Sequence, residues 1–163
     1  MKEILLDYDK CNGCMACAQA CAAEHSESKT IVGAILEGVR PRIFVQSVDG
    51  KPFPIICRHC EDAPCVDACM AGAMQKDPET GVVTNEGHAE ACVGCWMCMM
   101  ACPYGAVDRD YRSNTALKCD RCPEREIPAC VASCPNNALF YTDVNVYADA
   151  RRTAEGRRLL AIG

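Results

Sequence analysis

Sixteen cysteines in 163 residues constrain this chain more than any other feature of its sequence. They form four groups of four, and the spacing within each group is short enough for one loop to wrap around a metal centre. The groups are Cys11-x2-Cys14-x2-Cys17-x3-Cys21, Cys57-x2-Cys60-x4-Cys65-x3-Cys69, Cys92-x2-Cys95-x2-Cys98-x3-Cys102 and Cys119-x2-Cys122-x7-Cys130-x3-Cys134. Groups one and three have the spacing of bacterial 4Fe–4S loops, and Pro103 follows Cys102 as it usually does there. The sequence therefore predicts four 4Fe–4S clusters.

The composition fits a core that is built partly from inorganic clusters. The chain has three phenylalanines and one tryptophan, so it has few large side chains to bury. The free energy of cluster ligation can replace part of the missing hydrophobic burial, which predicts that the protein without iron is largely unfolded. The net charge of −5 becomes more negative once thiolates hold clusters. Such an acidic chain is a poor candidate for binding nucleic acid and suits a partner surface of positive charge.

Strand and turn patterns between the cysteine groups predict an α+β chain of short hairpins and short helices around the clusters. A strand is expected at 3–8, and 43–48 with 51–56 form the pattern of a hairpin around an Asp-Gly turn. A second turn at 76–81 precedes another strand. The alanine-rich residues 12–25 are expected to form a cluster loop followed by a helical turn.

A recurring element suggests two nested modules, each similar to a bacterial two-cluster ferredoxin. A short apolar segment follows the last cysteine of groups two, three and four, and only 22 residues separate group two from group three. These two groups are therefore predicted to form an inner module, which interrupts an outer module made of groups one and four. Sequential pairing, of one with two and of three with four, is the alternative. The predicted segments are 1–30 with 113–145 (outer module), 31–56 (insertion hairpin), 57–112 (inner module) and 146–163 (basic tail).

The same comparison predicts which cysteines share a cluster. In two-cluster ferredoxins, the fourth cysteine of a group points away from its own loop and ligates the other cluster. Applying this exchange to the nested pairs gives four predicted sites. Site 1 is Cys11, Cys14, Cys17 and Cys134; site 2 is Cys21, Cys119, Cys122 and Cys130; site 3 is Cys57, Cys60, Cys65 and Cys102; site 4 is Cys69, Cys92, Cys95 and Cys98.

Outside the cysteines, the sequence offers no recognisable substrate site. It lacks the glycine motifs that bind dinucleotides or phosphate, and no Ser/His/Asp arrangement stands out. His59, between two cysteines of group two, is expected to be a hydrogen-bonding loop residue, because a full set of cysteines needs no histidine ligand. Trp96 is expected to shield a cluster. The arginine-rich tail favours a solvated helix, with a docking element for a partner as the alternative.

Together the motifs resemble the four-cluster ferredoxin-type electron-transfer subunits of multi-subunit oxidoreductases. The resemblance covers about residues 1–142 and implies a non-catalytic role with four 4Fe–4S clusters in a line. Its members accompany molybdenum, tungsten or nickel enzymes and hydrogenases. This chain departs from the pattern in lacking proline after Cys21 and Cys69. The segments that carry it are Cys57-Arg-His-Cys-Glu-Asp-Ala-Pro-Cys65, Cys102-Pro-Tyr-Gly-Ala, Lys118-Cys-Asp-Arg-Cys122 and Pro-Ala-Cys130-Val-Ala-Ser-Cys-Pro135.

The resulting hypothesis is a subunit that relays single electrons between a catalytic subunit and a second redox partner. The short C-terminus is similar to the companions of tungsten aldehyde oxidoreductase and CO dehydrogenase rather than to the membrane-docked dimethyl sulfoxide reductase type. A free soluble polyferredoxin is the alternative, and a zinc or disulfide scaffold is the alternative of another class. Copies could also associate into longer wires. The chain shows no signal peptide and no run of apolar residues that predicts a membrane span, so the cytoplasm is the expected location.

Overall fold

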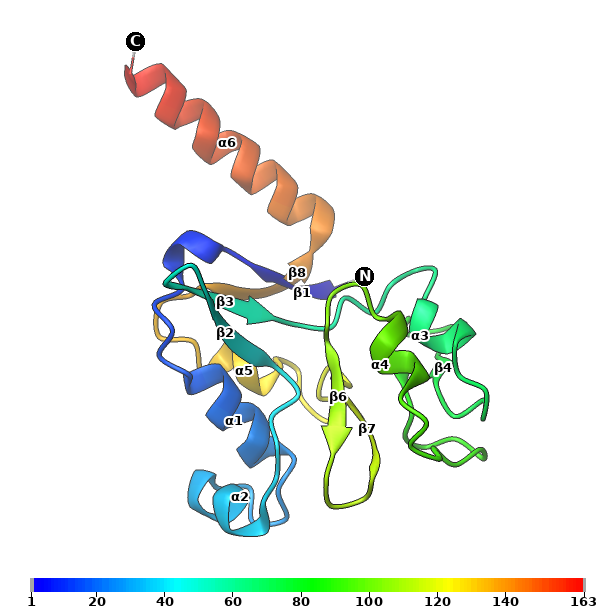
Figure 1. Cartoon of the computed structure of the whole chain (residues 1–163). Coiled ribbons are helices and arrows are strands. Elements are labelled where there is room, and N and C mark those ends of the chain that lie inside the picture. The colour runs from blue at the N-terminus through cyan, green and yellow to red at the C-terminus, as the bar shows by residue number, and fades with distance from the viewer. Residues whose placement is uncertain (1, 163) are drawn as a thin grey trace.

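The computed structural model describes residues 2–162; residues 1 and 163, the ends of the predicted outer module and basic tail, lie outside the described residues. Within this range the chain forms four two-stranded antiparallel sheets and mostly short helices (Figure 1), in agreement with the predicted α+β class. The strands are β1 (Lys2–Leu6), β2 (Phe44–Val48), β3 (Lys51–Ile55), β4 (Gln75–Lys76), β5 (Val83–Thr84), β6 (Val107–Asp110), β7 (Thr115–Lys118) and β8 (Leu139–Asp143). The helices are the 3-10 turn η1 (Tyr8–Lys10), α1 (Ala16–Glu24), α2 (Ile31–Glu37), α3 (Pro64–Asp67), α4 (Met97–Ala101), α5 (Ala129–Ala132) and α6 (Val144–Ile162).

The two ends of the chain pair with each other. β1 and β8 are antiparallel, with Leu6 opposite Leu139, and the N–H of Asp7 continues the ladder by donating to the Ala138 carbonyl at 2.8 Å. Next to this sheet, α1 packs against α5. The apolar core between these elements is formed by Ile4, Ala18, Cys21, Ile43, Ile56, Cys130 and Leu139. It thus includes one cysteine of group one and one of group four. This core therefore joins segments from opposite ends of the sequence.

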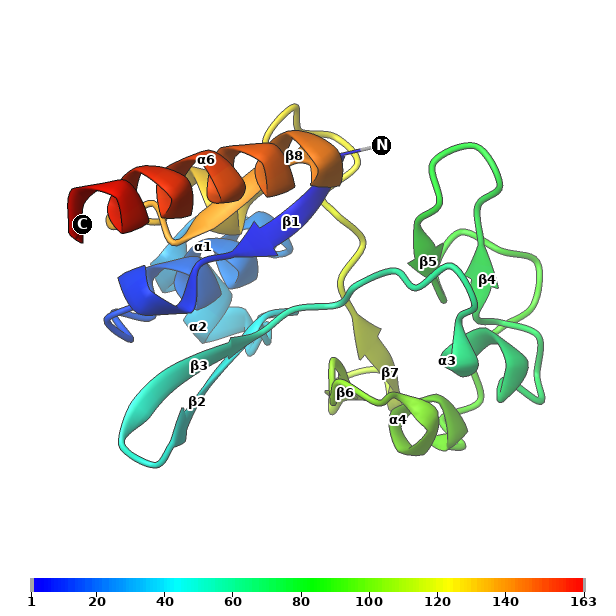
Figure 2. The same cartoon turned by 90° about the horizontal axis from the view of Figure 1, so that it is seen from above.

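A second core lies within the middle of the chain. Here α3 packs against α4, and the hairpins β4–β5 and β6–β7 complete a separate lobe, seen beside the first in Figure 2. The β6–β7 hairpin crosses the predicted boundary between residues 112 and 113, which falls in its turn. The buried residues of this core are Ala63, Cys65, Met74, Val83, Cys98, Val107 and Ala116. They include one cysteine of group two and one of group three.

The cysteine-free insertion contains the predicted hairpin and also a helix that was not predicted. Asp49 (φ 50°) and Gly50 (φ 77°) join β2 to β3 with two left-handed residues, as a two-residue hairpin turn requires. The additional helix is α2. The Thr30 hydroxyl caps it by accepting from the Gly33 N–H at 3.0 Å, and the left-handed Gly38 ends it. These start and stop signals were present in the sequence, so α2 was predictable.

The other local predictions hold with shifted ends. β1 stops at Leu6, because Asp7 precedes η1 as its N-cap and Tyr8 is the first residue of η1. The helical turn expected before residue 25 is the nine-residue helix α1. The second turn is present between β4 and β5, where Asp77 accepts from the N–H groups of Glu79 and Thr80.

The C-terminal helix α6 projects from the molecule (Figure 1). None of its described side chains is buried, and Leu160 is 84% exposed. Arg151 reaches back to the Asp7 carboxylate at 3.4 Å, which links the helix to the end of β1. No helix within residues 2–162 combines the length and the apolar content needed to cross a membrane.

Candidate metal centres

The loops of groups one and three share one backbone conformation. Gly13 (φ 72°) and Met15 (φ 64°) flank Cys14, and Gly94 (φ 68°) and Trp96 (φ 65°) flank Cys95, all in the left-handed region. Alternating left-handed residues turn successive backbone N–H groups toward a common centre, which favours an anionic group there. Each loop then enters a helix, α1 or α4, that carries the third cysteine of its group.

Groups two and four use a different residue at the equivalent position. His59 (φ 47°) and Arg121 (φ 63°) stand immediately before the second cysteine, where groups one and three have glycine. Their backbone N–H groups donate to the first cysteine of the same loop, Cys57 or Cys119, each at 3.4 Å. The non-glycine left-handed residues therefore also aim backbone donors at sulfur.

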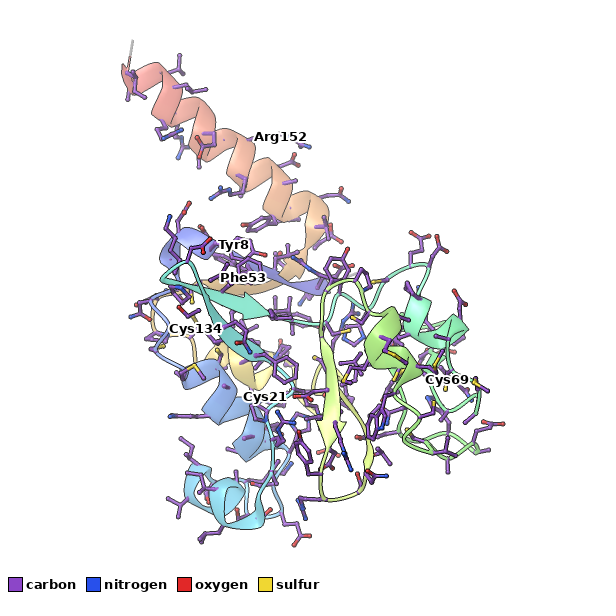
Figure 3. All side chains as sticks on the ribbon, in the orientation of Figure 1. Tyr8, Cys21, Phe53, Cys69, Cys134 and Arg152 are labelled. Carbon is purple, nitrogen blue, oxygen red and sulfur yellow. The ribbon has the colours of Figure 1, made fainter. Side chains whose placement is uncertain are left out.

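Three of the predicted sites each border one cavity. The cysteines of site 1 line a cavity that the β2–β3 hairpin also covers, those of site 3 line a cavity with His59 and Lys118, and those of site 4 line a cavity with Trp96. In each cavity one cysteine comes from a different group than the other three: Cys134, Cys102 and Cys69 respectively. Figure 3 shows Cys134 and Cys69 on opposite sides of the molecule.

The cysteines of site 2 are crowded together. Burial raises the pKa of Cys130, and the charges of Cys119, Cys21 and Cys122 raise it further. Burial also raises the pKa of Cys119 to about 12, against the lowering effect of the hydrogen bond from the Arg121 N–H. Thiols that oppose one another's ionisation in this way become thiolates when a metal supplies positive charge. The donor set of site 2 thus fits a metal cluster.

Thiols of different predicted sites are also close enough to affect one another. The charge of a site 1 cysteine contributes to the raised pKa of a thiol in site 2. Cysteines of site 3 likewise contribute to the raised pKa of one thiol in site 2 and of one thiol in site 4. The three pairs are Cys17 with Cys130, Cys57 with Cys119, and Cys65 with Cys98. Of the sixteen cysteines, Cys14 in site 1 and Cys95 in site 4 are exposed, and the remainder are half-buried or buried.

Backbone N–H groups donate to cysteine sulfurs throughout the molecule. Cys102 and Cys134 each accept from the residue four positions later, at 3.4 and 3.2 Å. Cys69 and Cys92 accept from Met74 and Ala116 at 3.3 and 3.5 Å, and Cys21 accepts from the Arg42 N–H at 3.2 Å. Hydrogen bonds to sulfur stabilise thiolates and raise the reduction potential of a cluster that they ligate.

Two buried N–H donors support the fit of clusters to these sites. Arg42 Nε and His59 Nε2 are buried and have no hydrogen-bond partner within residues 2–162. Arg42 lies beside site 2, where its backbone donates to Cys21, and His59 lines the cavity of site 3. A buried donor without a partner is costly, so each needs an acceptor. A 4Fe–4S cluster would present sulfur acceptors at both places.

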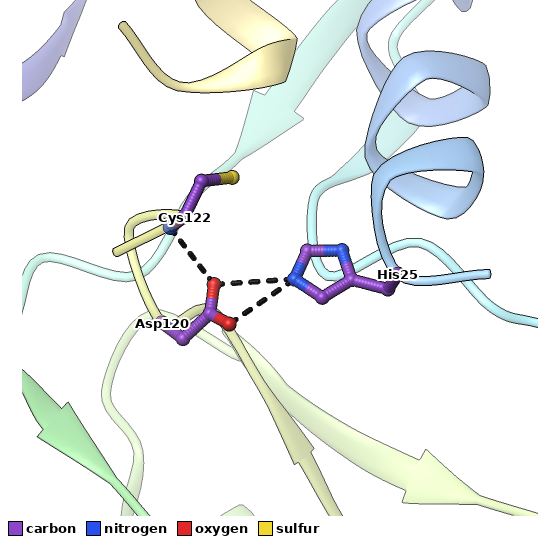
Figure 4. Close-up of side chains that lie close together, drawn as sticks. All are labelled: His25, Asp120 and Cys122. Atoms are coloured by element: carbon purple, nitrogen blue, oxygen red, sulfur yellow. Dashed lines mark hydrogen bonds and ion pairs between the residues drawn. The ribbon is translucent and has the colours of Figure 1, made fainter. Parts of the chain in front are cut away.

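A hydrogen-bonded network next to site 2 was not predicted (Figure 4). Asp120 accepts from His25 Nε2 at 3.2 Å, from Arg42 Nη1 at 2.8 Å and from the Cys122 N–H at 3.0 Å. Burial opposes a charge on His25, but its hydrogen bonds to Asp120 and to Cys21 together outweigh burial and raise the pKa of His25 to about 10. Burial likewise opposes the charge on Asp120, yet His25 and Arg42 hold its pKa well below the usual range.

This network is a support for site 2 rather than a separate metal site. His25, Asp120 and Cys122 do place ligand atoms within 4.8 Å of one another. However, His25 Nδ1 donates to the Cys21 carbonyl at 2.7 Å while Nε2 donates to Asp120, so neither ring nitrogen has a lone pair for a metal. The one sequence signal for it was the position of Asp120 between two cysteines of group four.

Comparison with known proteins identifies the family. The model of the 4Fe–4S dicluster domain matches residues 48–144 of the chain. This protein belongs to the 4Fe–4S dicluster domain family. An iron-sulfur protein of Rhodospirillum rubrum is 37% identical to it over 98% of this chain and 93% of the relative. The electron transport protein HydN of Escherichia coli K12 is also 37% identical, over 98% of this chain and 97% of the relative.

Among solved structures, the chain is similar over most of its length to a chain of the active site complex BamBC of benzoyl coenzyme A reductase in complex with benzoyl-CoA. One of its chains is 23% identical, with 95% of this chain and 89% of that chain covered and a TM-score of 0.48. Membership of the 4Fe–4S dicluster domain family, with relatives named as iron-sulfur and electron transport proteins, identifies this chain as a ferredoxin-type electron carrier. It binds 4Fe–4S clusters and is not itself a catalytic subunit.

Proposed function

We propose that this protein is a four-cluster subunit that relays single electrons between a catalytic oxidoreductase subunit and a second redox partner. The observation that carries the proposal is the match between three cavities and three predicted ligand sets. Each cavity has four cysteines at its border, which is the number that one 4Fe–4S cluster requires. The crowded thiols of site 2 supply the fourth set.

The proposed organisation is two nested ferredoxin-like modules, with the cysteines of sites 1 to 4 as iron ligands. The two cores support it, because one contains cysteines of groups one and four and the other contains cysteines of groups two and three. Sequential pairing would instead draw groups one and two into one core. We retain the proposed divisions 1–30 with 113–145, 31–56, 57–112 and 146–163, with the β6–β7 hairpin joining the two modules.

Electrons would pass through the sites in the order 1, 2, 3, 4 or in reverse, because the thiols of successive sites are neighbours. The exposed Cys14 and Cys95 make sites 1 and 4 the proposed points of entry and exit. Apolar side chains are exposed near both, which suits contact with partner proteins. Close to site 1 they are Tyr8, Met15 and Phe53, with Tyr8 stacked on Phe53 at 4.9 Å (Figure 3), and close to site 4 they are Val93, Met99 and Met100.

The proposed catalytic partner is a molybdenum, tungsten or nickel enzyme, with tungsten aldehyde oxidoreductase or CO dehydrogenase preferred. The names of the relatives support electron transport but do not identify the partner. The exposed helix α6 is the proposed docking element. Sixteen free thiols suit a reducing compartment, which supports the cytoplasm as the proposed location. Association of copies end to end into longer wires is a further proposal that particle length in electron microscopy would test.

Anaerobic purification from the native source, with the tagged full chain as bait, tests this function. We expect brown protein that absorbs near ~400 nm with about sixteen irons per chain, together with a co-purifying oxidoreductase subunit. A chain that ends at residue 147 should keep its iron but lose the partner if α6 docks it. Brown protein that purifies alone would favour the free polyferredoxin. Colourless protein with about four zinc ions would favour the zinc scaffold and refute the proposal.

A further inference from the structure

Lys118 is a buried cation beside one predicted cluster site. It stands at the end of β7 and is 3% exposed. Its Nζ donates to the Val83 carbonyl at 2.5 Å and lies 3.4 Å from both the Cys119 carbonyl and His59 Nδ1. These three acceptors match the three N–H donors of an ammonium group. The contacts therefore hold the Lys118 side chain in one position.

No carboxylate within residues 2–162 pairs with this ammonium group, whose recorded contacts are the three acceptors above. A buried charge without a counter-charge is strongly destabilising. Lys118 lines the cavity of site 3, and its charge opposes the rise that burial imposes on the pKa of Cys65, a cysteine of that site. The missing counter-charge is therefore expected inside the cavity. A cluster and its four thiolates together carry net negative charge and would supply it.

The charges beside the other predicted sites are placed differently. Arg42, next to site 2, is neutralised by Asp120 at 2.8 Å and Glu86 at 2.9 Å. Lys10 lines the cavity of site 1, but its side chain is half exposed and pairs with Asp7. The described residues that line the cavity of site 4 include no charged side chain. Arg121, between Cys119 and Cys122 of site 2, is also buried without a carboxylate partner among the described residues, but its guanidinium donates to the Thr80 carbonyl at 3.3 Å and lines none of the three cluster cavities. Within residues 2–162, Lys118 is thus the unpaired buried cation that lines a cluster cavity.

His59 adds a second donor to the same cavity. Its Nδ1 accepts from the Val83 N–H at 3.0 Å. Because Nδ1 uses its lone pair as an acceptor, the hydrogen of the ring is on Nε2, the buried nitrogen that lacks a partner within the described residues. A neutral N–H donor to cluster sulfur favours the more negative, reduced form.

We propose that Lys118, supported by His59, gives the cluster of site 3 the highest reduction potential of the four, so that it is the first to accept an electron. This inference rests on the proposed four-cluster function. Reduction adds one electron to the site and makes or breaks no bond. The added negative charge lies next to a fixed ammonium group in surroundings of low dielectric constant, where the attraction is strong. An electron that enters at site 1 or at site 4 would therefore come to rest at site 3, an inner site of the proposed order.

Potentiometric titration of the holoprotein with dithionite, followed by electron paramagnetic resonance, tests the inference. Lys118→Met and Lys118→Gln remove the charge, the second while keeping a hydrogen-bond donor. We expect the equilibrium constant for reduction of the first cluster to fall at least tenfold in both variants. For one electron, this lowers the highest midpoint potential by about 59 mV or more. Lys51→Met, which removes the same charge from an exposed position on β3, should leave it unchanged.

A second measurement uses variants at the cysteine ligands, with Lys118 unchanged, to assign the paramagnetic resonance signal that appears first on reduction to a cluster site. In the Cys65→Ser variant, which replaces a ligand of site 3, the signal that appears first on reduction of the wild type should be lost or displaced. In the Cys95→Ser variant, which replaces a ligand of site 4, it should persist. The opposite pattern, or an unchanged highest potential in both Lys118 variants, would overturn the inference while leaving the carrier function intact. Absence of iron from the wild-type protein would instead refute the carrier function itself.

Discussion

Cys134 lines the same cavity as Cys14, although the two residues lie near opposite ends of the sequence. The cavity has three cysteines from group one and a single cysteine from group four. The N–H of Ala138 donates to the Cys134 sulfur at 3.2 Å, which orients this thiol just before β8 begins. Since β8 pairs with β1, the strand that leads into group one, the outer sheet aligns the two groups.

The exchange of fourth cysteines predicts which double variants combine their effects. Cys134→Ser should disrupt site 1 and remove about four of the sixteen irons. Adding Cys14→Ser, a change at the same site, should remove little more iron. Adding Cys122→Ser, a change in the same sequence group but at site 2, should remove a second cluster. Iron and sulfide analysis of the three proteins distinguishes these outcomes, and the reverse pattern would show that each group holds its own cluster.

Asp120 should contribute far more to stability than an exposed aspartate with a similar ion pair. Asp120→Asn removes the negative charge that faces His25 and leaves Arg42 with only Glu86 as a counter-charge, so we expect a loss of about 3 kcal/mol, at the low end for breaking a buried pair. Asp149 pairs with Arg152 at the surface of α6, where both side chains are more than 70% exposed. Asp149→Asn should therefore cost about 0–1 kcal/mol. Denaturant titration of the two holoproteins measures the difference, and equal losses would contradict this role for Asp120.

The raised pKa of His25 predicts a stability difference that depends on pH. A histidine has an ordinary pKa of about 6.5, and the folded protein raises that of His25 to about 10. Protonation of His25 therefore stabilises the folded protein fully below about pH 6.5, and this contribution declines as the pH rises toward 10. The difference in thermal stability between wild type and His25→Gln should shrink over that interval. Loss of cluster absorbance on heating reports it, and a gap that is constant or widens would contradict the pairing with Asp120.

Gly94 and Gly105 offer a matched test of the loop of site 4. Both have left-handed backbones, at φ 68° and 61°, so alanine is strained at either position. A Cβ atom at Gly94 would also lie 2.3 Å from the Asn114 carbonyl oxygen, whereas a Cβ atom at Gly105 would have no described atom within 4 Å beyond its own chain neighbours. Gly94→Ala should therefore displace the loop and reduce the iron content, while Gly105→Ala should cost only about 1–2 kcal/mol of backbone strain. Equal iron content in the two variants would show that the loop tolerates the clash.

Removal of iron should unfold the protein. Cysteines are part of both hydrophobic cores, and the largest fully buried side chains of the described residues are only Met74, Val83 and Pro128. Without a metal, the crowded thiols lose the charge that holds them together. We expect a chelator under reducing conditions to abolish cooperative thermal unfolding and the dispersed amide signals of the nuclear magnetic resonance spectrum. A well-dispersed spectrum of the iron-free protein would contradict this expectation.

The sequence by itself determined the local chemistry of this protein. Cysteine spacing predicted 4Fe–4S binding, which membership of the family supports, because thiolates a few residues apart must share a loop. The Asp49-Gly50 turn was predictable for the same local reason, since few residues adopt two successive left-handed conformations. Even α2, which was missed, had its signals at Thr30 and Gly38.

Only the tertiary structure decided how distant segments meet. Lys118 and His59 are far apart in the sequence and become neighbours because the chain brings β5 and β7 to the same cavity. The contacts of Asp120 with His25 and Arg42 arise in the same way, across segments with no shared pattern. Periodicity and spacing report what a residue does within its own loop or helix. The burial and the charge environment of a side chain depend on long-range packing, which leaves no local signal in the sequence.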